Sequence, residues 1–200
     1  MFIISATKNQ RRFAMVFYLV RHGQTDWNNE RRIQGHSDVP MNETGYKQIH
    51  DLADKMAKEK LHFDRIISSP LSRARITAGI IAEKVGYDKE IIVDDLFIER
   101  YCGNLEGVLW YPGLNLDDPK YGMESYDQVS ERVKKAIDGY NFSKDEKVMI
   151  ASHGGTLTAL RTVLSDYKIG YSDPEAPIIQ GNVLCCIKEE VKETQFFNLF

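Results

Sequence analysis

The chain carries the stretch VFYLVRHG at residues 16–23, an apolar run followed at once by arginine, histidine and glycine. A second stretch, VMIASHGG at residues 148–155, repeats this layout with its own histidine and glycines. Short apolar runs bounded by glycine are typical of buried strands. In parallel α/β sheets the ligand crevice lies beyond the carboxyl ends of the strands. We therefore expect Arg21, His22 and His153 to lie there together and to bind an anion, for which a phosphoryl group fits best.

Strands and helices are predicted to alternate along the chain. Apolar runs predict strands over residues 15–20, 64–68, 91–93 and 147–151, with closing strands over 183–187 and near 191–198. One of the closing strands could run antiparallel. This alternation predicts an α/β fold, a three-layer α/β/α sandwich on a mostly parallel sheet.

Caps and apolar periodicity mark the helices between these strands. Asn42 is predicted to cap a helix over residues 43–60, and Ser69, with Pro70 behind it, to cap one that stops at Gly86. A capping box at residues 125–128 begins the next helix, and a short helix follows His153. Residues 94–122, which are rich in glycine and proline, are predicted to be irregular.

The bulk composition limits the class of protein. Two hundred residues with a hydrophobic fraction of 42% fit one domain with its own core. The net charge of −3 gives no indication of a nucleic-acid partner or an acidic membrane surface. Three cysteines do not suggest a disulfide framework and favour a cytoplasmic location. No histidine or cysteine spacing typical of a metal site occurs, so neither a metal nor another cofactor is predicted.

Residues 1–14 are expected to be an extension outside the core, which leaves residues 15–200 as a single domain. Lys8, Arg11 and Arg12 lie between two apolar pieces, which is the wrong order for a signal peptide. Cleavage after residue 20 would also separate the first strand from Arg21. Met15 could be the original start.

Four motifs occur in order along the chain. They are RHG at 21–23, SSPLSRA at 68–74, ERYCGNLEG at 99–107 and SHGG at 152–155. In this order and spacing the chain resembles the histidine phosphatase superfamily, also called phosphoglycerate mutase-like, over about residues 15–190. The resemblance implies a phosphoglycerate mutase-like fold and a metal-independent reaction through phosphohistidine.

The resemblance also implies a role for each matched residue. His22 would be the nucleophile that takes the phosphoryl group, and Arg21 and Arg73 would bind its oxygens. His153 would hold the phosphoryl group and its developing charge. Glu99 would give a proton to the leaving oxygen and then activate water. Six further residues are assigned to substrate binding: Asn28, Gln34, Gly35, Arg100, Trp110 and Tyr111.

Elementary chemistry supports these roles. A nucleophilic imidazole must be neutral, and two nearby arginines disfavour the imidazolium form of His22. Arginine forks suit the negative charge of a phosphoryl group. A dianionic phosphate beside Glu99 favours the protonated form that a general acid needs.

Each residue taken alone also has a simpler interpretation. Arg73 could be an exposed helix residue, as Arg75 is expected to be, and Glu99 could be a surface acid. Glu106 could serve only to hydrogen-bond its loop. The remaining histidines are expected to be structural or exposed: His36, His50 and His62.

Three functions from different classes stay open. A phosphomonoester hydrolase acting on a small phosphorylated metabolite leads, because residues 108–124 lack an arginine pair and offer Lys120 as their single cation. A cofactor-dependent phosphoglycerate mutase is the second, since such mutases carry arginines in a longer insertion here. A non-catalytic phosphate-binding protein is the third. The substrate and the oligomeric state are left open.

Overall fold

The computed structural model describes residues 14–116, 118–174, 177–189 and 194–200, and one six-stranded sheet runs through them in the order β3-β2-β4-β1-β5-β6. β3, β2, β4 and β1 are parallel, whereas β5 is antiparallel to β1 and β6 is antiparallel to β5. β5 therefore runs against the other strands, whereas β6 runs in the same direction as β1, so one of the two closing strands is antiparallel to the parallel set, as the sequence allowed. The strands are β1 (Ala14–Arg21), β2 (Arg65–Ser68), β3 (Ile92–Val93), β4 (Lys147–Ser152), β5 (Val183–Glu189) and β6 (Gln195–Asn198).

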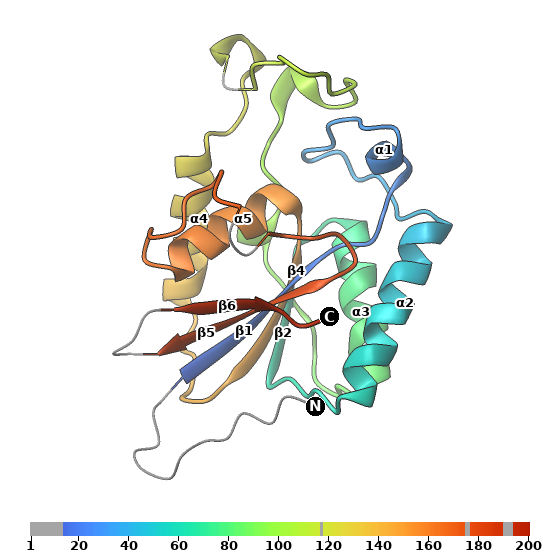
Figure 1. Ribbon diagram of the computed structural model, residues 1–200, viewed down its shortest axis with the longest axis vertical. Helices are drawn as coiled ribbons and strands as arrows, with labels where there is room; N and C mark the ends of the chain where they lie inside the picture. Colours follow the sequence, from blue (N-terminus) through green and yellow to red (C-terminus); the bar gives the residue numbers. More distant parts are fainter. Residues whose placement is uncertain (1–13, 117, 175–176, 190–193) are drawn as a thin grey trace.

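Helices cover both faces of the sheet (Figure 1). Successive side chains of a strand point to opposite faces, so β1 contributes to two cores. Phe17 and Leu19 pack in the core with α4 and α5, while Tyr18 and Val20 pack in the core with α2 and α3. The helices are α1 (Asp26–Asn29), α2 (Glu43–Lys58), α3 (Ser72–Val85), α4 (Tyr126–Gly139) and α5 (Gly154–Leu164). The predicted three-layer α/β/α sandwich is confirmed.

Most of the predicted helix ends are confirmed. The Asn42 side chain accepts from the Gly45 amide at the start of α2, and Ser125 and Gln128 form the capping box of α4. The cap assigned to Ser69 is wrong, because α3 begins at Ser72 with Leu71 as its N-cap. Pro70 disfavours helical backbone at the residue before it, which keeps Ser69 out of the helix.

The predicted irregular region carries three short 3₁₀ helices among its described residues. They are η1 (Asp95–Phe97), η2 (Gly103–Leu105) and η3 (Pro119–Tyr121). The predicted N-terminal extension lies outside the described residues, apart from Ala14, which is the first residue of β1. Among the described residues, no helix has the length and apolar character needed to cross a bilayer.

Three neighbouring strands end at the same level of the sheet. Arg21 is paired with Ser152, and Ser68 is paired with Ala151. The His22 amide donates to the Ser152 carbonyl at 3.1 Å, and the Ser69 amide donates to the Ala151 carbonyl at 3.0 Å. The residues that follow β2, β4 and β1 therefore begin side by side at one edge.

Candidate active site

His22 follows β1 and is almost completely buried, with 2% of its surface exposed. Its Nδ1–H donates to the Gly23 carbonyl at 2.7 Å, which leaves the lone pair on Nε2. Burial, followed by the charge of Arg73, lowers the pKa of His22 from 6.5 to about 3, and Arg21 adds to the effect. The ring is therefore neutral and carries a lone pair, as a nucleophile requires.

His153 follows β4, and its ring centroid lies 5.2 Å from that of His22. Its Nδ1 accepts from Arg73 Nε at 3.2 Å, and its Nε2 lies 2.7 Å from Ser69 Oγ. Burial and the charge of Arg73 lower the pKa of His153 well below 6.5. Both predicted histidines thus meet at the strand ends, in the neutral form.

Arg73 lies in the first turn of α3 and is fully buried, so it is no exposed helix residue. Its Nη1 donates to the Ser37 carbonyl at 2.7 Å and its Nη2 to the Gly35 carbonyl at 2.9 Å. With the bond to His153, the described residues take three of the five N–H donors of the guanidinium. Two donors are left for an anion in the site.

Arg21 is the last residue of β1, and its guanidinium lies against Gly154. A Cβ atom added at Gly154 would come within 3.2 Å of Arg21 Cζ. Arg21 Nε is buried and has no hydrogen-bond partner among the described residues. A buried donor without an acceptor is costly, and a phosphoryl oxygen is the acceptor that would relieve this cost. This orphaned donor supports the predicted role of Arg21.

Glu99 lies in the loop after η1, and its carboxylate lies at the N-terminus of α5. Its Oε1 accepts from the Thr156 amide at 3.0 Å, and its Oε2 accepts from the Gly155 amide at 3.3 Å. These amides belong to the first turn of α5, whose N-cap is His153. The helix start therefore brings the predicted acid beside the second histidine.

The Glu99 loop is held by residues that the sequence did not single out. Arg132 of α4 donates from Nη1 to the Leu96 carbonyl at 2.6 Å and from Nη2 to the Glu99 carbonyl at 3.2 Å. His36 Nε2–H donates to the same Glu99 carbonyl at 2.8 Å. The structural role expected for His36 is thus a contact with the loop that carries the acid.

Glu106 has the structural role of its simpler interpretation, but its carboxylate holds the loop at residues 36–37 and not its own loop. Its Oε1 accepts from the His36 amide at 2.8 Å, and its Oε2 accepts from the Ser37 amide at 2.9 Å. Because the Ser37 carbonyl binds Arg73, Glu106 indirectly fixes that arginine. Arg75, His50 and His62 are exposed, as expected.

Three of the residues assigned to substrate binding lie in the loops around Arg73 and Thr25. Asn28 Oδ1 accepts from the Thr25 amide at 3.1 Å and closes the capping box of α1. Gln34 Oε1 accepts from the Thr25 hydroxyl at 3.0 Å. Gly35 acts through its carbonyl, which holds Arg73. A role for these residues in binding the substrate stays a prediction.

The other three residues of that set lie farther along the chain, and their role in substrate binding stays a prediction too. Arg100 is buried, stacks its guanidinium 4.3 Å from the Tyr126 ring centroid and donates from Nε to the Glu124 carbonyl. The structure therefore gives Arg100 a packing role. Trp110 and Tyr111 are 46% and 52% exposed, so both offer free aromatic surface.

Cys102 lies between the two glutamates of its motif but is not poised as a thiolate. Burial, followed by the charge of Glu99, raises the pKa of Cys102 to about 12. Among the described residues, no group of three histidine, cysteine or acidic side chains could hold a metal ion.

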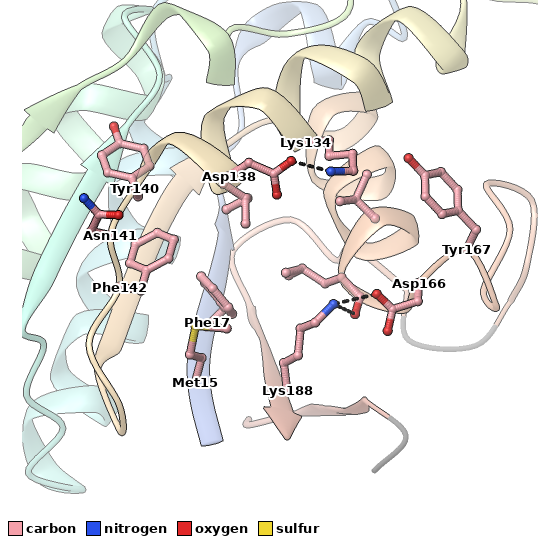
Figure 2. Close-up of a pocket in the computed structure, with 13 residues that line it drawn as sticks. Met15, Phe17, Lys134, Asp138, Tyr140, Asn141, Phe142, Asp166, Tyr167 and Lys188 are labelled. Atoms are coloured by element: carbon pink, nitrogen blue, oxygen red, sulfur yellow. Dashed lines mark hydrogen bonds and ion pairs between the residues drawn. The ribbon is translucent and has the colours of Figure 1, made fainter. Parts of the chain in front are cut away.

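A pocket of about 410 Å³ lies elsewhere, near the amino-terminal end of β1 (Figure 2). Met15 and Phe17 line it, and so do the ion pairs that Lys188 forms with Asp166 and Lys134 forms with Asp138. None of the residues predicted for catalysis lines this pocket. Its lysines are paired with acids, so it does not compete with the strand ends as an anion site.

Comparison with known proteins identifies the family. The family model described as the histidine phosphatase superfamily (branch 1) matches residues 17–176. The mycobacterial glucosyl-3-phosphoglycerate phosphatase has a similar fold, with a TM-score of 0.73 and 24% identity over 93% of this chain and 97% of that one. A phosphoglycerate mutase from Bacillus anthracis also has a similar fold, with a TM-score of 0.75 and 20% identity over 94% of this chain and 93% of that one, which confirms the predicted phosphoglycerate mutase-like fold.

Curated relatives from Arabidopsis thaliana point the same way. "Phosphoglycerate mutase-like protein 4" is 33% identical over 157 residues, 71% of this chain and 67% of the relative. "Metal-independent phosphoserine phosphatase" is 36% identical over 157 residues, 71% of this chain and 65% of the relative. The chain thus spans about two thirds of the length of these relatives. As its four motifs predict, the chain belongs to the histidine phosphatase superfamily, a family of phosphatase-type enzymes.

Proposed function

We propose that the protein hydrolyses phosphomonoesters through a phosphohistidine on His22. One observation carries the proposal: a neutral, buried imidazole with its lone pair on Nε2 lies beside the partly buried Arg21 and the fully buried Arg73. Such a site attracts a phosphoryl group and presents a nucleophile to it.

The proposed reaction has two steps, the formation of the phosphohistidine and its hydrolysis. In the first, His22 Nε2 forms a bond to phosphorus, the ester P–O bond breaks, and Glu99 gives its proton to the leaving oxygen. In the second, Glu99 takes a proton from water, the water oxygen bonds to phosphorus, and the P–N bond breaks. Arg21 and Arg73 bind the phosphoryl oxygens in both steps, and His153 donates to the same group.

The composition of residues 108–124 favours a hydrolase over a mutase. Within residues 108–124 Lys120 is the single cation of the sequence, and its ammonium is paired with Asp118 at 2.8 Å and lies over the Tyr121 ring. A mutase must hold a bisphosphate intermediate while the phosphoryl group changes position. The carboxylate or second phosphate of that intermediate would have no arginine to bind in residues 108–124. Exposed Trp110 and Tyr111 offer an aromatic surface to the leaving group instead. The proposed substrate is therefore a small phosphorylated metabolite.

A phosphoglycerate mutase is the second candidate, because one of the curated relatives is named as mutase-like. One assay separates the two. The enzyme is mixed with 3-phosphoglycerate and catalytic bisphosphoglycerate, and free phosphate and 2-phosphoglycerate are followed together. Phosphate release is expected to dominate, and isomerisation faster than phosphate release would establish the mutase.

We also propose that residues 15–200 form a single catalytic domain and that residues 1–14 are an extension of it, of which Ala14 prolongs β1. All four motifs lie within residues 15–200. The cytoplasm is the proposed location, because Cys102, Cys185 and Cys186 are buried as free thiols in the structure.

A further inference from the structure

Ser69 is a fully buried serine whose hydroxyl faces the second histidine of the site. Its Oγ lies 2.7 Å from His153 Nε2 and accepts from the Leu71 amide at 3.3 Å. Its own amide is tied to the Ala151 carbonyl at 3.0 Å, which fixes its backbone to β4. Ser69 therefore has a rigid position directly beside the ring of His153.

The hydrogen bonds around His153 assign the proton on its ring. Arg73 Nε–H can only donate, so His153 Nδ1 must be the acceptor of their 3.2 Å bond. A neutral imidazole has one ring proton, which is then on Nε2. The partner of that proton is Ser69 Oγ, which acts as the acceptor. Arg73 and Ser69 together hold His153 in the Nε2–H tautomer, one from each side.

We propose that Ser69 is a positioning residue that keeps the His153 Nε2–H in place as a donor to the phosphoryl group. This inference rests on the proposed function. Nε2–H is the only ring proton that this tautomer can offer to a phosphoryl oxygen. Ser69 Oγ accepts it while the site holds no substrate, and the arriving phosphoryl oxygen takes over as acceptor.

Removing the hydroxyl leaves a buried donor without an acceptor. A buried N–H that loses its partner is costly, so the ring of His153 would turn about its χ angles to find another. Such a turn moves the donor away from the phosphoryl oxygen, and a displacement of about 1 Å in a catalytic group can cost about 100-fold in rate. Ser69 thus acts through His153 rather than on the substrate.

Ser68 provides a matched control. It is also fully buried, and its hydroxyl donates to the Ser69 carbonyl at 2.9 Å rather than to a catalytic side chain. Ser69→Ala and Ser68→Ala each remove one buried hydroxyl from adjacent positions. We expect similar losses of folding stability from both changes, so a difference in turnover reports on His153 and not on packing.

The kinetic test measures kcat and KM for an aryl phosphate. Ser69→Ala is expected to lower kcat about 10- to 100-fold with little change in KM, because the donor serves the transition state. Ser68→Ala is expected to keep the wild-type kcat. Equal kcat values for wild type and Ser69→Ala would overturn the proposal, and so would equal losses in both variants.

The spectroscopic test follows the ring proton of His153 by 15N and 1H NMR, assigned by its absence in His153→Gln. The wild type is expected to show the proton on Nε2, and the signal should shift or exchange rapidly in Ser69→Ala while it persists in Ser68→Ala. A proton on Nδ1, or a signal unchanged by Ser69→Ala, would refute the inference.

The two tests separate this inference from the proposed function. If the wild type forms no phosphohistidine and releases no phosphate, the proposed function fails, and the NMR result alone decides the role of Ser69. If the wild type is active but Ser69→Ala matches it in kcat and in NMR signal, the function stands and the inference fails.

Discussion

Lowering the pH should destabilise this protein through His22 and His153, the two buried histidines of the candidate site. Burial, aided by Arg73, lowers the pKa of His22 from 6.5 to about 3 and the pKa of His153 well below 6.5. In the unfolded chain both rings regain the ordinary value. Below pH 6.5 the unfolded state therefore binds more protons than the folded state. The free energy of unfolding is therefore unaffected by the titration of these rings above pH 6.5, and it decreases as the pH falls from 6.5 toward 3.

The size of the effect at pH 5 follows from this difference. Each pH unit below 6.5 costs about 1.4 kcal/mol per histidine, so 1.5 units cost about 2 kcal/mol for His22. Because the folded pKa of His22 lies well below 5, the figure depends on the unfolded value alone. The pKa of His153 is shifted in the same direction, so its neutral ring adds to the loss of stability.

Urea unfolding at pH 7.5 and pH 5 measures this loss. His22→Gln should lose about 2 kcal/mol less than wild type between the two pH values, and the double variant with His153→Gln should lose less still. His50→Gln is the matched control, because His50 is exposed, and it should lose as much as wild type. If His22→Gln loses stability as steeply as wild type, the neutral buried imidazole is refuted.

The remaining predictions concern the reaction. Incubation with substrate should give an acid-labile, base-stable phosphoenzyme that His22→Ala lacks and His50→Ala keeps; a phosphoserine in its place would contradict the proposed nucleophile. EDTA should leave turnover unchanged, since Arg21 and Arg73 supply the positive charge, whereas activity lost to EDTA and restored by a divalent ion would require a different site. A chain that begins at Met15 should keep its turnover. A large loss of turnover in a shortened chain that still folds would place residues 1–14 in the domain. Glu99→Gln should slow the hydrolysis of alkyl phosphates more than that of aryl phosphates; equal slowing would argue against a proton donor.

Much of the fold could be predicted because strands and caps are local features. The apolar runs gave strands β1 and β4 to within one or two residues, since four or more buried positions in succession leave a clear pattern. The order of the strands could not be obtained in this way. β4 lies between β2 and β1 in the sheet, and nothing local to these segments specifies their neighbours.

Residues of the candidate site that lie in a sequence motif were predicted. Residues that only the tertiary fold places near the site were missed. His22 and His153 stand behind strands, so the strand-end rule located them. Arg132 looks like an ordinary charge on an amphipathic helix, because two of its partners, the Leu96 and Glu99 carbonyls, lie more than 30 residues away in the sequence. Ser69 was misread as a cap for a similar reason, since one partner of its hydroxyl is His153, 84 residues away, which nothing local to Ser69 indicates.

The start of α5 explains why the second histidine is followed by two glycines. His153 is the N-cap of this helix. The two glycines that follow it lie against side chains of opposite charge, Arg21 and Glu99. A Cβ at Gly154 would come within 3.2 Å of Arg21 Cζ, and one at Gly155 within 2.9 Å of Glu99 Oε1. A side chain at either position would therefore push away the cation or the acid. The SHGG motif supplies the second histidine and the space in which Arg21 and Glu99 lie close to it, as the proposed binding of one phosphoryl group requires.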